Sequence, residues 1–299
     1  MLDQSKLLPR KPPPFEIAAP RPPFRRQLLK WIGNKQKVAP HIISHFPQRF
    51  GTYLEPFLGS GGVLGVLNPR RAIAGDVFKP LIEIWQCLND DKEELKSWYA
   101  KRQALIARLG KLEAYERVRA AYNRSPNGAD LVFLSRACYG GVVRFRKLDG
   151  YMSTPCGAHN PVDAGSFAQR VELWHERTQG TRFVHADFAA TMRKAKKGDL
   201  VYCDPPYSDT QTILYGAQAF SLQRLFEAIE DCRKRGVFVA LSIDGTKLSG
   251  QKLCNISIPG KLFKREVVVQ LGRSMLKRFQ MDGRSLEAHE VTDRLLLTY

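Results

Sequence analysis

A short run near residue 204 combines groups that could act on an amine. An apolar segment leads into Asp204-Pro205-Pro206-Tyr207. The two prolines stiffen the backbone and remove two N–H donors, so the Asp204 carboxylate and the Pro205 carbonyl can face outward as acceptors. An exocyclic amine has two N–H bonds that need acceptors, and Tyr207 could stack on the base that carries it. We interpret the run as a catalytic site, because a rigid turn alone would not need this combination.

A glycine-rich loop follows an earlier apolar segment and includes Gly59 and Gly61. Small residues let a ligand approach the backbone, where exposed N–H groups can face it. No lysine follows the glycines, which disfavours a nucleotide-triphosphate loop. The next apolar segment ends at Asp76, where a carboxylate can accept both hydroxyls of a ribose. The pair indicates an adenosine-containing cofactor, although a tight turn and a helix-capping Asp76 would give the same residues.

Composition narrows the partners of this chain. The 299 residues carry 47 Lys and Arg against 29 Asp and Glu, a formal charge of +18. Such an excess favours a polyanionic partner, most simply nucleic acid, and the alternative is a basic but otherwise ordinary enzyme. None of the six cysteines forms a C-x-x-C pair, so we expect no metal site and no disulfide framework.

The cellular location is predicted from the absence of a membrane-spanning or signal segment in the sequence. Residues 237–243 form the longest apolar stretch of membrane-like pattern, which is too short to span a bilayer. The N-terminus has no apolar signal core. Scattered single thiols suit a reducing compartment. We therefore expect a cytoplasmic protein with no membrane partner, which would associate with the nucleoid where its polyanionic partner is DNA.

Seven short apolar segments have the pattern of buried strands and end in turn or acidic residues. They are residues 52–57, 71–76, 181–187, 199–204, 237–243, 266–271 and 294–299. Helical patterns at 81–88 and 222–235 lie between them, the second after a capping residue, Ser221. This alternation predicts an α/β fold with a doubly wound, mostly parallel sheet.

Residues 90–178 interrupt the alternation and form a predicted insert. Helical patterns occur at 92–109, 112–122 and 130–139, and residues 144–151 read as a β-hairpin that turns at Asp149-Gly150. We expect residues 28–89 and 179–299 to form one cofactor-binding catalytic domain around this insert. The Pro-rich, basic residues 1–27 are expected to form an arm without regular structure.

Several of these motifs together resemble those of S-adenosylmethionine-dependent amino-group DNA methyltransferases. Asp204-Pro205-Pro206-Tyr207 resembles their catalytic motif, and residues 29–35, 55–61, 74–76 and 185–188 resemble their cofactor motifs. The motif order resembles that of the Dam-like N6-adenine enzymes, the alpha group of the D12 class, whose recognition domain lies between the cofactor and catalytic motifs. The resemblance implies a seven-stranded methyltransferase sheet. It also implies transfer of a methyl group to N6 of a flipped-out adenine in double-stranded DNA.

The resemblance also implies roles for single residues. Lys35 can pair with the methionine carboxylate of the cofactor, and Trp31 can wall off its methionine arm or simply pack in the core. Asp187 and Phe188 would bind and cover the adenine, although Asp187 could instead cap a helix. The implied cofactor-binding set is Trp31, Lys35, Glu55, Phe57, Gly59, Gly61, Asp76, Asp187, Phe188 and Asp204.

The hairpin resembles the DNA-reading hairpin of the Dam-like group but departs from it in detail. Residues 140–146 lack the polar side chains of the group's Asn-Gly-Leu-Cys-Arg-Tyr-Asn run and keep Arg144. Arg144 can contact a guanine or a phosphate, and Tyr139 is a candidate wedge beside the flipped base. Lys30 and Arg146 complete the expected DNA-binding set.

Three other functions would each explain part of the sequence. A cytosine-C5 methyltransferase would use a cysteine nucleophile such as Cys156. An RNA or other amino-group methyltransferase could share the Pro-Pro-Tyr turn, and a non-catalytic DNA-binding module would bind no cofactor. The recognition sequence, the oligomeric state and a companion restriction endonuclease stay open at this point.

Overall fold

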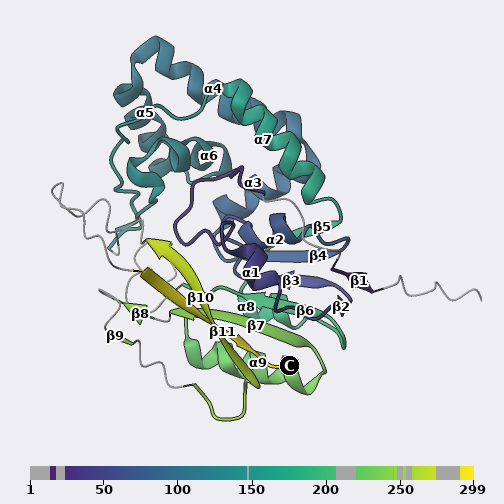
Figure 1. Cartoon of the computed structure of the whole chain (residues 1–299). Coiled ribbons are helices and arrows are strands. Elements are labelled where there is room, and N and C mark those ends of the chain that lie inside the picture. Colours follow the sequence, from purple (N-terminus) through teal and green to yellow (C-terminus); the bar gives the residue numbers. More distant parts are fainter. Residues whose placement is uncertain are drawn as a thin grey trace, which may run out of the picture.

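A mostly parallel sheet of seven strands forms the centre of the protein (Figure 1). The structure is a computed structural model that describes residues 14–17, 24–146, 148–206, 220–244, 246–247, 252–253, 258–273 and 290–299. The strand order is β10-β11-β7-β6-β3-β4-β5. The bounds are β3 Tyr53–Glu55, β4 Ala72–Asp76, β5 Thr181–His185, β6 Leu200–Cys203, β7 Phe238–Asp244, β10 Arg265–Arg273 and β11 Glu290–Leu297.

Five neighbouring strands, β7, β6, β3, β4 and β5, are parallel, whereas β11 is antiparallel to both β7 and β10. The predicted doubly wound, mostly parallel α/β sheet is therefore confirmed. Each of the seven predicted segments overlaps one of these strands. The topological switch point of the sheet lies between β3 and β6. From β3 the chain adds β4 and β5 on one side, and from β6 it adds β7 on the other.

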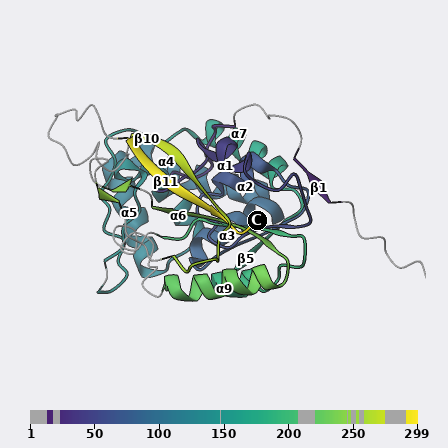
Figure 2. The same cartoon turned by 60° about the horizontal axis from the view of Figure 1, so that its bottom comes forward.

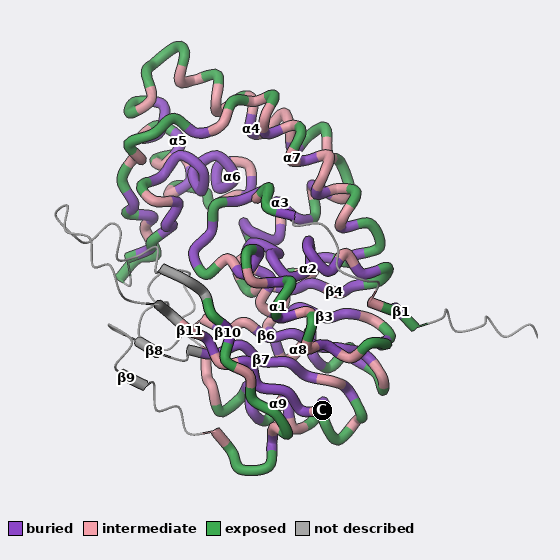
Figure 3. The backbone as a smooth tube through the Cα atoms, viewed as in Figure 1, coloured by how far each residue is buried: buried purple, intermediate pink, exposed green. Residues whose placement is uncertain are grey.

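Helices cover both faces of the sheet because alternate strand residues point to opposite faces. On β6, Leu200 and Tyr202 join one hydrophobic cluster, and Val201 and Cys203 join a second. The first cluster includes α1 Ala39–Ile43, α2 Gly62–Leu67 and α3 Lys79–Asp90, and the second includes α8 Phe188–Met192 and α9 Leu222–Lys234. Figure 2 shows α9 across the sheet from α1 and α2, and Figure 3 shows how thoroughly the strands between them are buried.

The two helices predicted between strands are both present. The pattern at 81–88 lies within α3, and that at 222–235 matches α9 to within one residue. Ser221 caps α9 as expected, since its hydroxyl accepts a hydrogen bond from the Arg224 backbone N–H at 3.3 Å. The first turn of α9 is therefore fixed by its cap.

A group of helices corresponds to the predicted insert and lies at the top of Figure 1. Its members are α4 Lys92–Leu109, α5 Lys111–Arg124, α6 Gly128–Ala137 and α7 Ala164–Arg177. The helix predicted to reach residue 139 ends two residues earlier, because the backbone is extended at Cys138 and Gly140 has a positive φ of 65°. A short 3₁₀ turn, η1 Tyr139–Gly141, follows.

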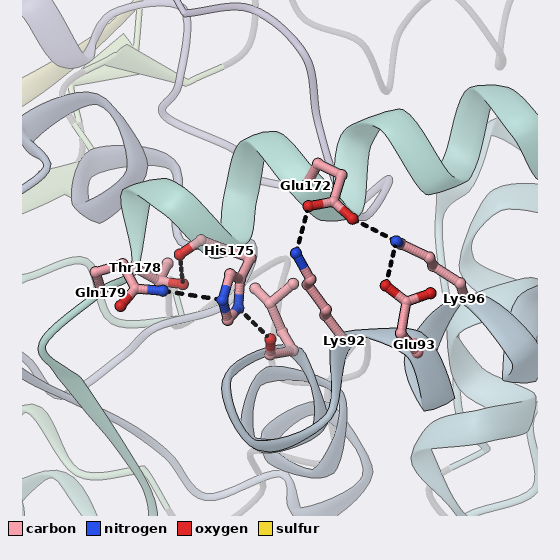
Figure 4. A network of polar contacts seen from close by, with 8 residues as sticks. Lys92, Glu93, Lys96, Glu172, His175, Thr178 and Gln179 are labelled. Atoms are coloured by element: carbon pink, nitrogen blue, oxygen red, sulfur yellow. Dashed lines mark hydrogen bonds and ion pairs between the residues drawn. The ribbon is translucent and has the colours of Figure 1, made fainter.

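Helix α7 was not predicted, and it carries the chain from the insert back to the sheet. Figure 4 shows the polar contacts that hold it. The Glu172 carboxylate pairs with Lys92 at 2.6 Å and with Lys96, both on α4. His175 Nδ1 donates to the backbone carbonyl of Leu88 on α3 at 2.8 Å. The Glu172 contacts hold α7 against α4 within the insert, and the His175 contact fixes α7 against α3.

The expectation of an irregular arm over residues 1–27 is wrong for two pieces of it. Phe15 in β1 Phe15–Glu16 lies 5.2 Å from Phe50 in β2 Arg49–Phe50, and the two strands pair. Phe24 is buried against Trp174 and under the Arg177 guanidinium. The prediction weighed proline content and charge, whereas the burial of these aromatic rings decides the outcome.

Backbone carbonyls of residues 26–28 are hydrogen-bonded by side chains of the insert. Arg136 donates to Gln27 and Leu28, Arg170 donates to Gln27, and Trp174 donates to Arg26 at 2.8 Å. We call residues 24–28 the strap. Its contacts with the insert fix the backbone position just before Lys30 and Trp31. The insert therefore helps to position the first predicted cofactor motif.

Two further features complete the description. Strand β8 Thr246–Lys247 pairs with β9 Lys252–Leu253 outside the large sheet. Within the described part of the chain, every helix is too short or too polar to cross a membrane.

Candidate active site

A pocket opens at the carboxyl ends of β3, β4 and β6, at the topological switch point of the sheet. Ligands of open α/β sheets bind in such crevices because the loops on either side diverge to opposite faces. Nearly all of the predicted cofactor residues line it, together with Pro206. They are Trp31, Lys35, Glu55, Phe57, Gly59, Asp76, Asp187, Phe188 and Asp204.

Lys35 and Asp204 both line the pocket and form an ion pair in which Lys35 is buried and Asp204 partly exposed. The Lys35 ammonium lies 2.8 and 3.0 Å from the two Asp204 carboxylate oxygens and 3.3 Å from Asp293 on β11. Burial alone would lower the Lys35 pKa, but the two carboxylates raise it above its usual value. The ammonium is therefore charged and directed at Asp204. Its predicted pairing with a methionine carboxylate stays a prediction.

Glu55 brings another carboxyl group to the pocket at the end of β3. The Tyr53 hydroxyl donates to it at 2.7 Å, and the Glu55 side chain is almost fully buried. Burial raises the pKa of Glu55 to about 8, and the negative charge of Asp204 acts in the same direction, against the hydrogen bond from Tyr53. Glu55 is therefore mostly neutral at pH 7.

Asp76 braces the glycine-rich loop. Its carboxylate accepts hydrogen bonds from the Gly59 and Phe78 N–H groups, both at 3.0 Å. Burial raises the pKa of Asp76, and these backbone donors oppose the rise. The tight-turn interpretation of Asp76 is thus present in the structure, and it leaves the carboxylate at the pocket wall.

The two predicted glycines have different surroundings, although both have a positive φ, 49° at Gly59 and 63° at Gly61. Gly59 lines the pocket beside the Trp31 indole. Gly61 lies against Trp85 instead, and a Cβ there would come within 3.0 Å of the ring. Gly61 therefore lets the loop pack closely against Trp85 and is absent from the pocket lining.

Three phenylalanine rings line one end of the pocket. Phe57 and Phe188 stack with centroids 5.2 Å apart, and the ring of Phe220 meets them edge-on at 5.8 and 6.0 Å. Phe220 was not predicted, because a single aromatic before a helix cap carries no distinctive spacing. Together the rings form an apolar wall suited to a flat aromatic group.

Asp187 lies beside this wall and also caps a helix. Its carboxylate accepts from the Ala189 N–H at 3.0 Å at the start of α8 and pairs with Arg224 at 3.2 Å. Arg224, which was not predicted, also lies over the Phe188 ring at 5.2 Å. The capping alternative for Asp187 is therefore observed, and the residue still lines the pocket.

The predicted hairpin is present over the described residues of that segment. Phe145 and Met152 form an antiparallel bridge, and the Arg146 N–H donates to the Tyr151 carbonyl at 2.9 Å. The Arg146 guanidinium pairs with Asp149 at 2.6 Å and lies 4.3 Å from the centroid of the Tyr151 ring. Arg146 thus stabilises the hairpin tip.

The other predicted DNA contacts lie close to this hairpin and outside the pocket lining. Arg144 and Lys30 are exposed, and Tyr139 is 42% exposed on η1. Lys30 lies against Gly141 of the same turn. Phe145 at the hairpin base packs 5.4 Å from Phe78, a residue of the pocket wall. The hairpin therefore begins beside the pocket.

The remaining predictions have mixed outcomes. Pro206 lines the pocket, Pro205 lies between it and Asp204, and Tyr207 falls outside the described residues. The Cys156 backbone forms an isolated antiparallel β-bridge with Cys138, both thiols are free, and Cys156 is not in the pocket lining. Burial raises the pKa of the Cys156 thiol, which disfavours it as a nucleophile. No group of three or more metal-binding side chains occurs among the residues that the structure describes.

The family model of the D12 class N6 adenine-specific DNA methyltransferases matches residues 31–261. This span includes both sides of the pocket and the whole insert. The chain belongs to that family of adenine methyltransferases. The methyltransferase therefore acts on DNA and methylates adenine at N6.

Relatives of this methyltransferase carry names of the same kind. It is 26% identical over 242 residues to the Type II methyltransferase M1.LlaDCHI of Lactococcus lactis, covering 75% of this chain and 83% of that protein. It is 27% identical over 237 residues to the DNA adenine methylase of Escherichia coli K12, covering 75% and 82%. A DNA adenine methylase of Vibrio cholerae is 26% identical over 234 residues, covering 73% and 81%.

Proposed function

We propose that the methyltransferase takes its methyl group from S-adenosylmethionine held in the pocket. The fit rests on this chain's own groups. The wall of Phe57, Phe188 and Phe220 suits an adenine ring. The Asp76 carboxylate lines the same pocket and could accept hydrogen bonds from the ribose hydroxyls of the same ligand. The Asp204 carboxylate, which already pairs with Lys35, suits the positively charged sulfur of this cofactor. When bound, this cofactor supplies a methyl group activated on a positively charged sulfur.

The Asp204 carboxylate is the proposed acceptor for the amine of the target base. Lys35 holds both of its oxygens, so the carboxylate is oriented before the amine arrives. Together with the Pro205 carbonyl it would accept both N–H bonds of adenine N6. Loss of conjugation with the ring then makes the nitrogen lone pair more available. This ion pair is the observation that carries the proposal.

The target adenine must leave the duplex stack to reach Asp204, because N6 lies inside the double helix. Unstacking costs a few kcal/mol, and we propose that Tyr207 offsets part of it by stacking on the flipped base. Asp204 or water takes the N6 proton during or after transfer. We propose no metal ion in this reaction.

Residues 90–178 are the proposed recognition region for double-stranded DNA. Between residues 92 and 177 the chain carries fifteen Lys and Arg against nine Asp and Glu, a charge that binds phosphates without reading sequence. Arg144 is the proposed base reader, Tyr139 the proposed wedge, and Lys30 and Arg146 the proposed backbone contacts. Residues 28–89 and 179–299 would form the catalytic domain.

Site specificity is part of the proposal. One relative is named a Type II methyltransferase and others are named DNA adenine methylases. The names are compatible with either a companion restriction endonuclease or a solitary enzyme. We propose that this chain modifies adenine within one short sequence.

The test is to treat unmethylated genomic DNA with the purified protein and S-adenosylmethionine and to sequence the product with modified bases resolved. The expected result is modified adenine confined to one short sequence motif. Adenine modified without regard to its neighbours would contradict site specificity. Methylation that occurs only with a different methyl donor would contradict the cofactor.

A further inference from the structure

The C-terminal strand brings a second carboxylate to the ammonium that holds Asp204. Asp293 on β11 is 1% exposed, and its Oδ2 atom lies 3.3 Å from Lys35 Nζ. Strand register sets this position, because β11 pairs with β7 from Leu297 opposite Ala240 to Asp293 opposite Asp244. Asp293 thus lies where β7 ends, at the edge of the sheet that carries Asp204.

Two carboxylates contact the Lys35 ammonium. One buried ammonium faces two carboxylates, Asp204 and Asp293, while Glu55 nearby is mostly neutral at pH 7. With Asp204 alone, Lys35 would form a neutral pair and compete with the target amine for the same oxygens. With Asp293 present, the ammonium is shared between two carboxylates.

We propose that Asp293 is a positioning residue for methyl transfer, acting through Lys35 to keep Asp204 a strong acceptor. This inference rests on the proposed role of Asp204 and assigns a function to the C-terminal strand. Asp293 draws the ammonium toward β11 and fixes its position. Asp204 then keeps its orientation while part of its charge stays available to N6.

The charge that develops in the reaction explains why a shared ammonium would favour catalysis. The new bond joins the methyl carbon to adenine N6, and the bond from that carbon to sulfur breaks with its electron pair left on sulfur. Positive charge therefore moves from sulfur to N6, until N6 releases its proton to Asp204 or water. Fixed negative charge beside N6 stabilises that transition state more than it stabilises the neutral amine.

The test compares Asp293→Asn with Asp293→Glu and with a matched control, Asp231→Asn. Asp231 is an exposed carboxylate on α9 that pairs with Arg235, away from the pocket lining. We expect Asp293→Asn to lower kcat by about tenfold, equivalent to about 1.4 kcal/mol of transition-state stabilisation. KM for S-adenosylmethionine and for DNA should change less than kcat. Asp293→Glu should recover part of the loss, and Asp231→Asn should behave as wild type.

Several outcomes would overturn the inference. They are an unchanged kcat in folded Asp293→Asn, a loss confined to KM, and equal losses in the Asn and Glu variants. If Asp293→Asn does not fold, Asp293→Ser replaces it: a wild-type kcat in folded Asp293→Ser overturns the inference, whereas a reduced kcat at unchanged KM supports it. If neither variant folds, Asp293 serves stability alone and the inference fails. Failure of the wild-type protein to methylate adenine with S-adenosylmethionine would instead refute the proposed function.

Discussion

At the scale of single residues, the arrangement around Lys35 explains why carboxyl groups with different charge can share one pocket. Asp204 is paired with the ammonium, whereas Glu55 is bonded to a tyrosine hydroxyl and almost fully buried. The charged carboxylate faces the site where a cationic methyl donor and an amine would meet. The mostly neutral one, Glu55, ends β3 just before the glycine-rich loop. Their surroundings therefore assign them different roles.

The protonation of Glu55 predicts a pH dependence of stability. Its folded pKa of about 8 lies above the ordinary value of 4.5, so the folded state holds a proton that the unfolded state loses. The stability contribution of this proton is full below about pH 4.5 and is lost as the pH rises through about 8. Glu55→Gln should remove this loss, which is at most a few kcal/mol.

Urea unfolding of both proteins at several pH values between about 5 and 9 measures this effect. The free energy of unfolding should fall more steeply with pH in the wild type than in Glu55→Gln. Parallel pH profiles would show that Glu55 is already ionised in the folded protein.

Asp76 is expected to hold the cofactor as well as the loop. Asp76→Ala should weaken S-adenosylmethionine binding by roughly 1.5–3 kcal/mol, the scale of a hydrogen bond to a charged group. Asp76→Asn keeps one acceptor for the Gly59 N–H and serves as the control for loop geometry. Titration calorimetry gives both affinities, and an unchanged affinity in Asp76→Ala would remove Asp76 from the cofactor site.

At the scale of elements, the hairpin gives different surroundings to two arginines that are only two positions apart in the sequence. Arg146 pairs with Asp149 and lies on the Tyr151 ring. Within the described residues, the Arg144 side chain has no hydrogen bond or ion pair, and it is exposed. Phe145, between them, anchors the hairpin to Phe78. Arg144 is therefore the better placed of the two to reach a base edge.

Arg144→Ala should relax the preference for one base pair of the recognition sequence by about 1–3 kcal/mol. Arg146→Ala is the matched control, which should loosen the hairpin and weaken all sites to a similar degree. Methylation rates on a panel of single-base variants of the site distinguish the two effects. A preference profile unchanged in Arg144→Ala would make Arg144 a phosphate contact.

Elements with a strong local pattern were predictable, and those fixed by distant partners were not. The buried parallel strands and α4 follow from apolar runs and helical spacing, and α4 has the predicted bounds. Helix α7 has apolar residues at helical spacing, Phe167, Val171 and Trp174, within a polar stretch that was assigned no element. Residues 24–27 are ordered by Arg136, Arg170 and Trp174, more than 100 positions away in the chain.

The candidate site shows the same division. Motif residues such as Glu55, Asp76 and Asp204 reach one pocket because the carboxyl ends of neighbouring parallel strands lie together. Phe220 and Asp293 were missed because their roles depend on contacts across the fold and not on any local spacing. The pairing of Lys35 with Asp204 was missed for the same reason, since 169 positions separate them.

At the scale of the whole molecule, the sheet and the insert meet around one pocket. The strap at residues 24–28 ties α6 and α7 to the start of the cofactor motif, and Phe78 joins the pocket wall to the hairpin. DNA held by the insert would therefore lie beside Asp204. The charge of +18 supports such binding over the molecule as a whole.

The most direct test of this account is mass spectrometry of nucleosides from duplex DNA treated with the protein and deuterated S-adenosylmethionine. Wild-type protein should yield N6-(trideuteromethyl)adenine. Asp204→Ala should yield none above background while keeping the wild-type circular dichroism spectrum, because the amine loses its charged acceptor. Labelled cytosine in the wild-type digest, or labelled adenine from Asp204→Ala at the wild-type rate, would contradict the account.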